Sequence, residues 1–167
     1  LWAKNSHETA DTTGLTSADA LISKVDGWLL DAKTNHRRFA CYAVTLDDLG
    51  SLKAKFGEVA VQQIQQKVAS RLLRVMREDD CLARVGEGAF MFVLAPVRHL
   101  DLEICVQLAS RLKAAIEGPI PIDATTVRVS CSIGFCRSDQ IDEGTAEDLR
   151  AAAEVAVRDA SRNGASS

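Results

Sequence analysis

Residues 77–94 read Arg-Glu-Asp-Asp-Cys-Leu-Ala-Arg-Val-Gly-Glu-Gly-Ala-Phe-Met-Phe-Val-Leu and decide the fold. Two apolar runs, residues 81–85 and 89–94, flank Gly86-Glu87-Gly88. This pattern predicts a β-hairpin with a glycine-bearing turn. Glycine permits positive φ angles and leaves backbone N–H groups uncovered, so we expect that a phosphate can approach the turn closely. The stretch therefore predicts a candidate ligand site as well as a connection.

The hairpin resembles the central motif of the GGDEF family of diguanylate cyclases, which reads Arg-x-Gly-Gly-Asp/Glu-Glu-Phe. Here the same frame is filled by Arg84-Val85-Gly86-Glu87-Gly88-Ala89-Phe90. The arginine, the first glycine and the phenylalanine match. The family's metal-binding acid is replaced by Gly88, and the glutamate after it by Ala89. The resemblance therefore implies a degenerate GGDEF domain that lacks cyclase activity.

Further motifs extend this resemblance over residues 11–164. Asp11-Thr12-Thr13-Gly14-Leu15 is similar to the family's entry turn, and Ser132-Ile133-Gly134 matches its Ser-x-Gly strand. We expect residues 1–12 to be a linker or a helix from an upstream domain, and residues 13–167 to be the degenerate GGDEF domain. Because the chain opens with Leu1 rather than Met, we interpret it as part of a larger bacterial signalling protein with any sensor or anchor upstream.

Most positions that bind metal, guanine or phosphate in the family have changed. The resemblance places the two metal aspartates, the two guanine readers and the phosphate-binding lysine at Thr45, Asp47, Lys53, Gln62 and Ser161. Magnesium prefers carboxylate oxygens, which Thr45 lacks, so we expect neither bound Mg²⁺ nor another cofactor. A residual diguanylate cyclase would have to hold its metal with Asp47 and Glu87, and Glu87 would repel a triphosphate.

An Arg-x-x-Asp motif, Arg77 to Asp80, precedes the hairpin, and Asp80 lies six residues before Gly86. In the family this register marks the inhibitory site for cyclic di-GMP. Arginine donates a planar fork to phosphate or guanine, and aspartate accepts from guanine N–H groups. Arg111 matches a position from which the family can reach the ligand bound to a neighbouring subunit. The Arg-x-x-Asp spacing alone is weak evidence for a site, because residues 98–101 share it. The alternatives are a solvated ion pair for Arg77 and Asp80 and a solvated helix arginine for Arg111.

Hydrophobic periodicity predicts helices and strands on both sides of the hairpin. The expected helices span about 17–29, 59–77, 99–117 and 147–162, and the expected strands 38–46 and 127–135. The inward side of the helix at 99–117 is predicted to consist of Leu102, Cys105, Leu108, Leu112 and Ile116. Strand, helix, hairpin, helix and strand in this order indicate an α+β fold. Its nucleotidyl-cyclase-like βαββαβ (ferredoxin-like) core has a central antiparallel sheet flanked by helices.

The composition is that of one globular domain, with 167 residues, 47% hydrophobic and 26% charged. A net charge of -3 and 5% aromatic residues provide neither the cationic stripe nor the stacking platform of a nucleic-acid binder. The odd number of cysteines, without a Cys-x-x-Cys pair, favours small buried residues in a reducing compartment. No apolar run is long enough to span a bilayer. We expect a cytoplasmic domain that contacts neither nucleic acid nor membrane.

Two functions of different classes follow. In the first, the chain is a catalytically silent receptor that binds cyclic di-GMP through Arg77 and Asp80, with Arg111 as a clamp across a homodimer. Ligand binding would then join protomers or shift another domain of the parent protein. In the second, the chain is a nucleotide-independent scaffold that dimerises or docks a partner protein. A third possibility, a GTP-binding regulator, is opposed by Lys53 and Gln62, which replace the guanine readers.

Overall fold

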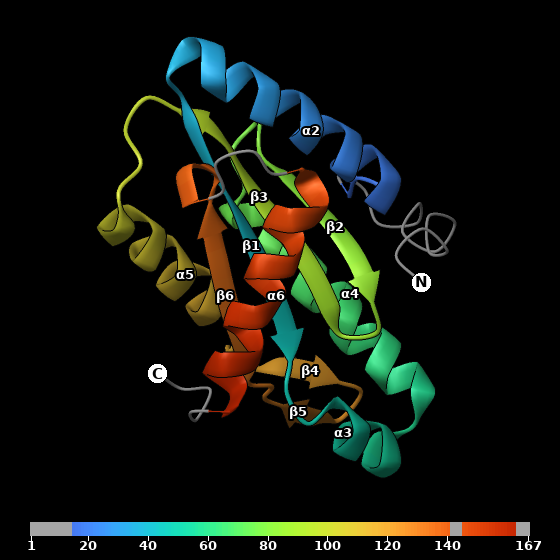
Figure 1. Cartoon of the computed structure of the whole chain (residues 1–167). Helices are drawn as coiled ribbons and strands as arrows, with labels where there is room; N and C mark the ends of the chain where they lie inside the picture. Colours follow the sequence, from blue (N-terminus) through green and yellow to red (C-terminus); the bar gives the residue numbers. More distant parts are fainter. Residues whose placement is uncertain (1–14, 141–144, 163–167) are drawn as a thin grey trace.

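A central antiparallel sheet organises the computed structural model, which describes residues 15–140 and 145–162 (Figure 1). The elements in chain order are α2 (Ala18–Asn35), β1 (Arg38–Leu46), α3 (Leu49–Phe56), α4 (Glu58–Val75), β2 (Cys81–Gly86), β3 (Ala89–Val97), α5 (Leu102–Ile116), β4 (Ile120–Ile122), β5 (Thr125–Val127), β6 (Cys131–Arg137), the 3-10 helix η1 (Ser138–Gln140) and α6 (Ala146–Arg162). The four strands of the sheet follow the order β2-β3-β1-β6, as in a ferredoxin-like βαββαβ core. The predicted α+β fold, with a central antiparallel sheet flanked by helices, is confirmed.

Helices cover both faces of the sheet (Figure 1). One hydrophobic cluster joins α2 and α6 to the sheet and includes Leu21, Phe39 and Leu149. The other joins α4 and α5 to the opposite face and includes Tyr42 and Ile64. The interior strand β1 is therefore buried on both sides along most of its length, which explains why its sequence reads as an apolar run with only loose alternation.

Side chains that accept backbone hydrogen bonds fix where the helices begin and end. Ser17 Oγ accepts from Ala20 N at 3.2 Å and starts α2, as expected of an N-cap serine. Asp101 Oδ1 accepts from Ile104 N at 2.9 Å, so α5 starts at Leu102 rather than at residue 99. The C-terminal end of α4 falls at Val75 instead of residue 77, because the backbone N–H beyond it turns toward a carboxylate that is described below.

Beyond these helix ends, the structure corrects three further predictions about the elements. The single strand expected at 127–135 is divided, because Val127 pairs with Ile120 in the β4-β5 ribbon and β6 begins only at Cys131. Helix α3 was not predicted; its eight residues bury only Leu49 and so lack a long apolar stripe. Leu102 was expected to face inward but is 58% exposed, because it lies in the first turn of α5, whose buried stripe starts at Cys105.

Two predictions about composition can be compared with the described residues. The five cysteines are buried and unpaired with one another, as their placement in apolar segments indicated. No helix within residues 15–140 and 145–162 combines the length and the apolarity needed to cross a membrane. Residues 1–14, which contain the expected linker and most of the entry turn, lie outside the described part of the chain.

Candidate functional site

The β2-β3 turn lies at the end of the sheet that also carries α3 and the β4-β5 ribbon (Figure 1). Gly88 adopts a φ of 68°, and its backbone N–H donates to Gln65 Oε1 at 2.6 Å. Its carbonyl accepts from Leu46 N at 2.8 Å. Gln65 is buried on α4. The expectation that this turn presents a free N–H group to a phosphate is therefore wrong for Gly88, whose polar groups are both satisfied within the chain.

The space beside Gly88 is occupied as well. A Cβ atom built on Gly88 would lie 2.7 Å from Leu49 Cδ2, which is closer than van der Waals contact allows. Leu49 is the first residue of α3 and is buried. An acidic side chain at position 88 would therefore need Leu49 to move, in addition to the strain of a positive φ for a residue with a Cβ.

Asp47 follows β1 at the same end of the sheet, and two serines hold its carboxylate. Asp47 Oδ1 accepts from Ser132 Oγ at 2.9 Å, and Asp47 Oδ2 lies 3.4 Å from Ser130 Oγ. Thr45, at the other expected metal position, is exposed and pairs with Ala89. Among the residues that the structure describes, no group of three or more His, Cys, Asp or Glu side chains is arranged to hold a metal ion.

Lys53 links α3 to the hairpin turn. Its ammonium group lies 3.2 Å from Glu58 Oε1 and 3.6 Å from Glu87 Oε2. The pKa of Lys53 is raised, mainly by the hydrogen bond to Glu58 and next by the negative charge of Glu87. Gln62 is exposed on α4. The side chain of Ser161, the fifth changed position, lies outside the described part of α6.

The Arg-x-x-Asp motif forms the corner between α4 and β2. Asp80 Oδ2 accepts from the backbone N–H of Arg77 at 2.8 Å, and Asp80 Oδ1 accepts from Ala95 N at 2.8 Å. The guanidinium of Arg77 lies 3.4 Å from the same carboxylate. The Asp80 side chain is 1% exposed, whereas that of Arg77 is 55% exposed. Asp80 is therefore a buried group that shapes the corner and orients Arg77, and not half of a solvated ion pair.

Arg77, Asp80 and Arg111 line one groove of about 390 Å³ between β3 and α5. The structure thus brings together the three residues that the sequence singled out. The apolar lining of the groove consists of Val75, Leu94, Val97, Leu100, Ile104 and Leu108. An open groove with an apolar lining and two cationic side chains can hold a planar base and a phosphate group together.

Sequence reasoning missed two further polar residues of this groove, His99 and Gln107. The signal for Gln107 was its spacing, because residues 107 and 111 are four apart and share one face of α5. His99 lies just beyond β3 in the segment that leads to α5. His99 reaches the groove only because of the path that this segment takes from β3 to α5. No local sequence pattern predicts that path.

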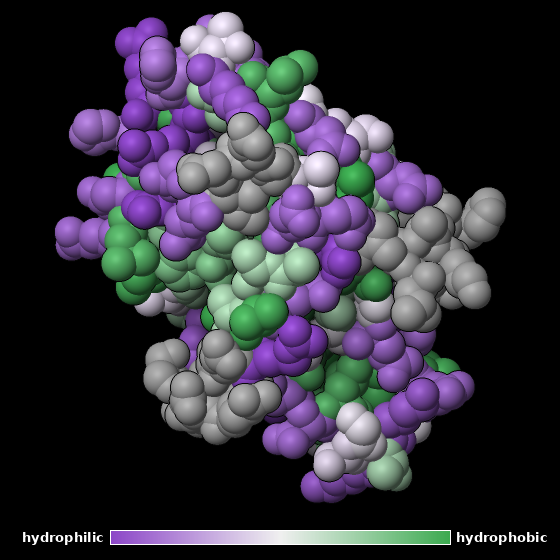
Figure 2. All heavy atoms as spheres, in the orientation of Figure 1, coloured by the Kyte–Doolittle hydropathy of each residue, from purple (hydrophilic) through white to green (hydrophobic). Residues whose placement is uncertain are grey.

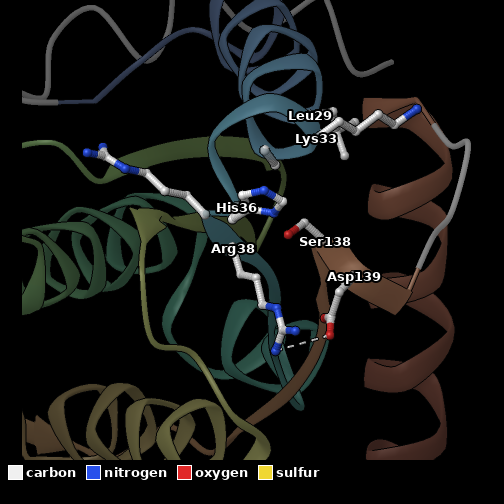
Figure 3. A pocket seen from close by; sticks show the side chains of 8 residues that line it. Leu29, Lys33, His36, Arg38, Ser138 and Asp139 are labelled. Carbon is white, nitrogen blue, oxygen red and sulfur yellow. Dashed lines mark ion pairs between the residues drawn. The ribbon is translucent and has the colours of Figure 1, made fainter.

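A second pocket, of about 270 Å³, lies where α2 meets the start of β1 (Figure 3). His36 adopts a left-handed conformation with a φ of 54°, and its ring points into the pocket (Figure 3). Arg38 reaches Asp139 at 3.5 Å, and Ser138 Oγ accepts from Phe39 N at 3.1 Å. Lys33 and Arg37 also line this pocket, which gives it a basic rim that the sequence did not predict.

The sequence matches the family described as "Diguanylate cyclase, GGDEF domain" over residues 9–167. Diguanylate cyclase TpbB from Pseudomonas aeruginosa is 28% identical over 109 residues, which are 64% of this chain and 24% of that protein. The chain thus spans about a quarter of the length of this curated relative.

Solved structures share the fold. The GGDEF domain of TpbB superimposes with a TM-score of 0.84 at 24% identity, over 92% of this chain and 88% of that one. The GGDEF domain of DgcB from Caulobacter crescentus, solved in complex with c-di-GMP, gives a TM-score of 0.80 at 18% identity, over 93% and 92% of the two chains. At these identities the likeness concerns the fold alone.

Proposed function

Because the chain belongs to the GGDEF family of diguanylate cyclase domains, we propose that it is a catalytically inactive member that binds cyclic di-GMP in the groove of Arg77 and Arg111. One observation carries the proposal: the two arginines and Asp80 line the same open groove. In this role the domain is a regulatory module of a longer signalling protein, and its output depends on domains beyond residues 1–167.

Loss of catalysis is supported by the contacts at the hairpin end. Phosphoryl transfer in this family needs metal-bound carboxylates that position a nucleotide. At the two altered metal-binding positions the chain has Thr45 and Gly88, and Leu49 fills the space that a side chain at position 88 would need. The remaining carboxylate, Asp47, accepts hydrogen bonds from Ser130 and Ser132. To bind Mg²⁺, Asp47 would have to give up those hydrogen bonds, and the other carboxylate ligands would still be lacking.

Ligand binding is supported by the chemistry of the groove. Cyclic di-GMP carries phosphate groups and guanine rings. Arg77 and Arg111 can donate charge-assisted hydrogen bonds to the phosphates or to the guanine edge. The apolar lining, which includes Leu94 and Ile104, suits the face of a guanine ring. Asp80 holds Arg77 in place through the backbone and the guanidinium, so it acts mainly as a positioning residue.

Calorimetric titration with cyclic di-GMP tests the proposal. We expect the wild-type domain to bind the ligand and Arg77→Ala to raise Kd by at least roughly a hundredfold, because several charge-assisted hydrogen bonds are lost. Arg111→Ala should raise Kd by roughly tenfold. The matched control is Arg98→Ala, which removes the exposed arginine of the second Arg-x-x-Asp and should leave Kd unchanged.

Two results would contradict the proposal. Wild-type affinity in Arg77→Ala would remove the groove as the binding site. Formation of cyclic di-GMP from GTP and Mg²⁺ by the wild-type domain would show that the domain is an active cyclase. The absence of cyclic di-GMP binding in the wild type would favour the nucleotide-independent scaffold instead.

A further inference from the structure

A further pocket, of about 200 Å³, lies between the sheet and α6, the helix that crosses the front of the sheet in Figure 1. Its floor includes Ala43 and Met91, which belong to the hydrophobic cluster under α2 and α6. Thr45, Val85 and Ala89 lie on the same face, because side chains alternate along a strand, and they line the pocket as well. The pocket is therefore a gap in the packing of α6 on the sheet.

Small side chains explain why this pocket exists. Ala43 and Ala89 end at Cβ, and Ala89 pairs with Thr45 across β1 and β3. Small side chains at neighbouring positions leave space that the helix above them does not fill. Thr45 and Ala89 replace acidic residues of the family's motifs, so the same replacements leave the pocket floor uncharged. Leu49 and Gly88 meet on the opposite face of the sheet, and their contact does not close the pocket.

The pocket runs from an exposed rim to a buried floor. Ala43 is 4% and Met91 is 1% exposed, whereas Thr45 is exposed. Figure 2 shows apolar side chains over the middle of this face of the molecule, where α6 lies in Figure 1. An engineered apolar cavity of about 150 Å³ binds benzene. A pocket of about 200 Å³ therefore has room for a group the size of an aromatic ring with a short polar extension.

The mouth of the pocket carries one uncompensated positive charge. Glu154 and Arg158 of α6 line the pocket, and Arg158 is exposed. Glu154 is already paired with Arg150. No carboxylate among the described side chains forms an ion pair with Arg158. The guanidinium of Arg158 is therefore available to an anionic group, and the Thr45 hydroxyl adds a second donor at the rim.

We propose that this pocket binds a small carboxylic acid with an aromatic or branched apolar body. The body lies against Ala43, Ala89 and Met91, and the carboxylate accepts hydrogen bonds from Arg158 and from the hydroxyl of Thr45. Burial of apolar surface supplies most of the affinity. The arginine orients the ligand, because charge-assisted hydrogen bonds to a carboxylate are directional.

The charges favour a single carboxylate over a phosphorylated ligand. One guanidinium balances one negative charge, and Glu154 beside it opposes each further negative charge of a ligand, although its pairing with Arg150 reduces the repulsion. A triphosphate carries several charges, and the apolar floor offers it no donor. The lining of this pocket shares no described residue with the groove of Arg77 and Arg111. The inference therefore does not rest on cyclic di-GMP binding.

Titration of the 167-residue domain with sodium phenylacetate tests the proposal. NMR follows the methyl group of Met91 and the amides of residues 43–45 and 85–91. We expect saturable shifts with a Kd of about 0.1–1 mM, as is reasonable for a ligand of about ten non-hydrogen atoms. Phenylacetamide has the same shape without the charge, and its Kd should be higher by roughly tenfold.

Two variants separate the apolar and the charged contact. Ala89→Leu fills the pocket and should abolish the binding of both compounds. Arg158→Gln removes the charge, so it should raise the Kd of phenylacetate by roughly tenfold and leave that of phenylacetamide unchanged. The matched control is Arg74→Gln, because Arg74 is an exposed arginine of α4, which covers the other face of the sheet. This control should change neither Kd.

Three results would overturn the inference. One is the absence of saturable shifts at these residues up to about 10 mM phenylacetate. Another is equal affinity of the wild type for phenylacetate and phenylacetamide, which would show a pocket that accepts any apolar group. The third is wild-type affinity for phenylacetate in Arg158→Gln or in a folded Ala89→Leu. Circular dichroism checks the folding of Ala89→Leu, and the exposed position of Arg158 keeps the test decisive if that variant is unfolded.

Discussion

The two ends of the central sheet carry the two sites that the sequence pointed to, and they differ in what their polar groups contact. At the hairpin end, Gly88, Asp47 and Glu87 each bind a partner within the chain. At the other end, where β2 starts and β3 finishes, Arg77 is 55% exposed and shares an open groove with Arg111. The polar groups of the hairpin end are thus paired within the chain, whereas the groove end presents guanidinium donors to solvent.

This difference bears directly on ligand binding. A donor or acceptor that is already paired inside the protein must give up that contact before it can bind a ligand, which reduces the net free energy of binding. An exposed guanidinium held by a buried carboxylate exchanges only water. On the proposed function, the hairpin end has lost its catalytic groups, whereas the groove end keeps exposed arginines that can bind a ligand.

The largest effect on stability is expected at the groove end, from Asp80→Ala. This change leaves the part-buried N–H of Arg77 and the buried N–H of Ala95 without their acceptor, and should lower the free energy of unfolding by about 2–4 kcal/mol. Urea denaturation measures the loss. Asp79→Ala is the matched control, since Asp79 is exposed and its loss should cost less than about 0.5 kcal/mol. Equal stability of the two variants would show that Asp80 does not hold the corner.

A smaller effect is expected at the hairpin end, from Gly88→Ala. The new Cβ meets Leu49 Cδ2 at 2.7 Å, and the φ of 68° is strained for alanine, so we expect a loss of about 1–3 kcal/mol in unfolding free energy. At Gly86 a Cβ meets only Ala89 Cβ, at 3.6 Å. Gly86→Ala should therefore cost less than about 1 kcal/mol. If both changes cost the same, Leu49 does not fill the space beside Gly88.

The smallest effect concerns pH. Cys131 lies at the hairpin end opposite Leu46, and burial raises the pKa of its thiol from 9.0 to about 12. Because the thiol ionises near pH 9 only in the unfolded chain, its contribution to stability is complete below pH 9 and is lost as the pH rises toward 12. Between pH 9 and 10 the free energy of unfolding should fall by about 1 kcal/mol on this account.

Urea denaturation at pH 8, 9 and 10 checks this loss, with Cys131→Ala as the comparison. The variant lacks the thiol, so its stability should fall less steeply above pH 9 than that of the wild type. The other four cysteines are common to both proteins and contribute equally. Identical slopes would mean that Cys131 ionises in the folded state, and that the hairpin end is more open than its packing indicates.

Much of the fold followed from the sequence because its signals are local. Strand β1 has the predicted bounds of residues 38 and 46, since a run of β-formers ends at two aspartates. The hairpin follows from glycines between apolar runs. Where the prediction failed, tertiary contacts decided: Val127 pairs with Ile120 in a ribbon that the alternation of residues 127–135 did not reveal.

The residues of the candidate groove were singled out from the sequence, whereas the burial of one of them was not. The register of the Arg-x-x-Asp motif named Arg77 and Asp80, and the structure places both at one groove with Arg111. Asp80 is buried against β3, where its carboxylate accepts from Ala95 N, fifteen residues along the chain; no local sequence pattern signals this contact. Likewise, only the packing of α3 on the hairpin shows that Leu49 occupies the space beside Gly88.

The most direct test of the difference between the two ends is hydrogen exchange of the domain, measured by mass spectrometry with cyclic di-GMP and separately with GTP and Mg²⁺. We predict slower exchange at residues 75–80 and 97–111 with cyclic di-GMP. No change is predicted at residues 45–53 and 84–90 with either ligand. Protection of residues 84–90 by GTP and Mg²⁺, with none in the groove by cyclic di-GMP, would contradict the account, because it would place the ligand at the end that the chain has filled.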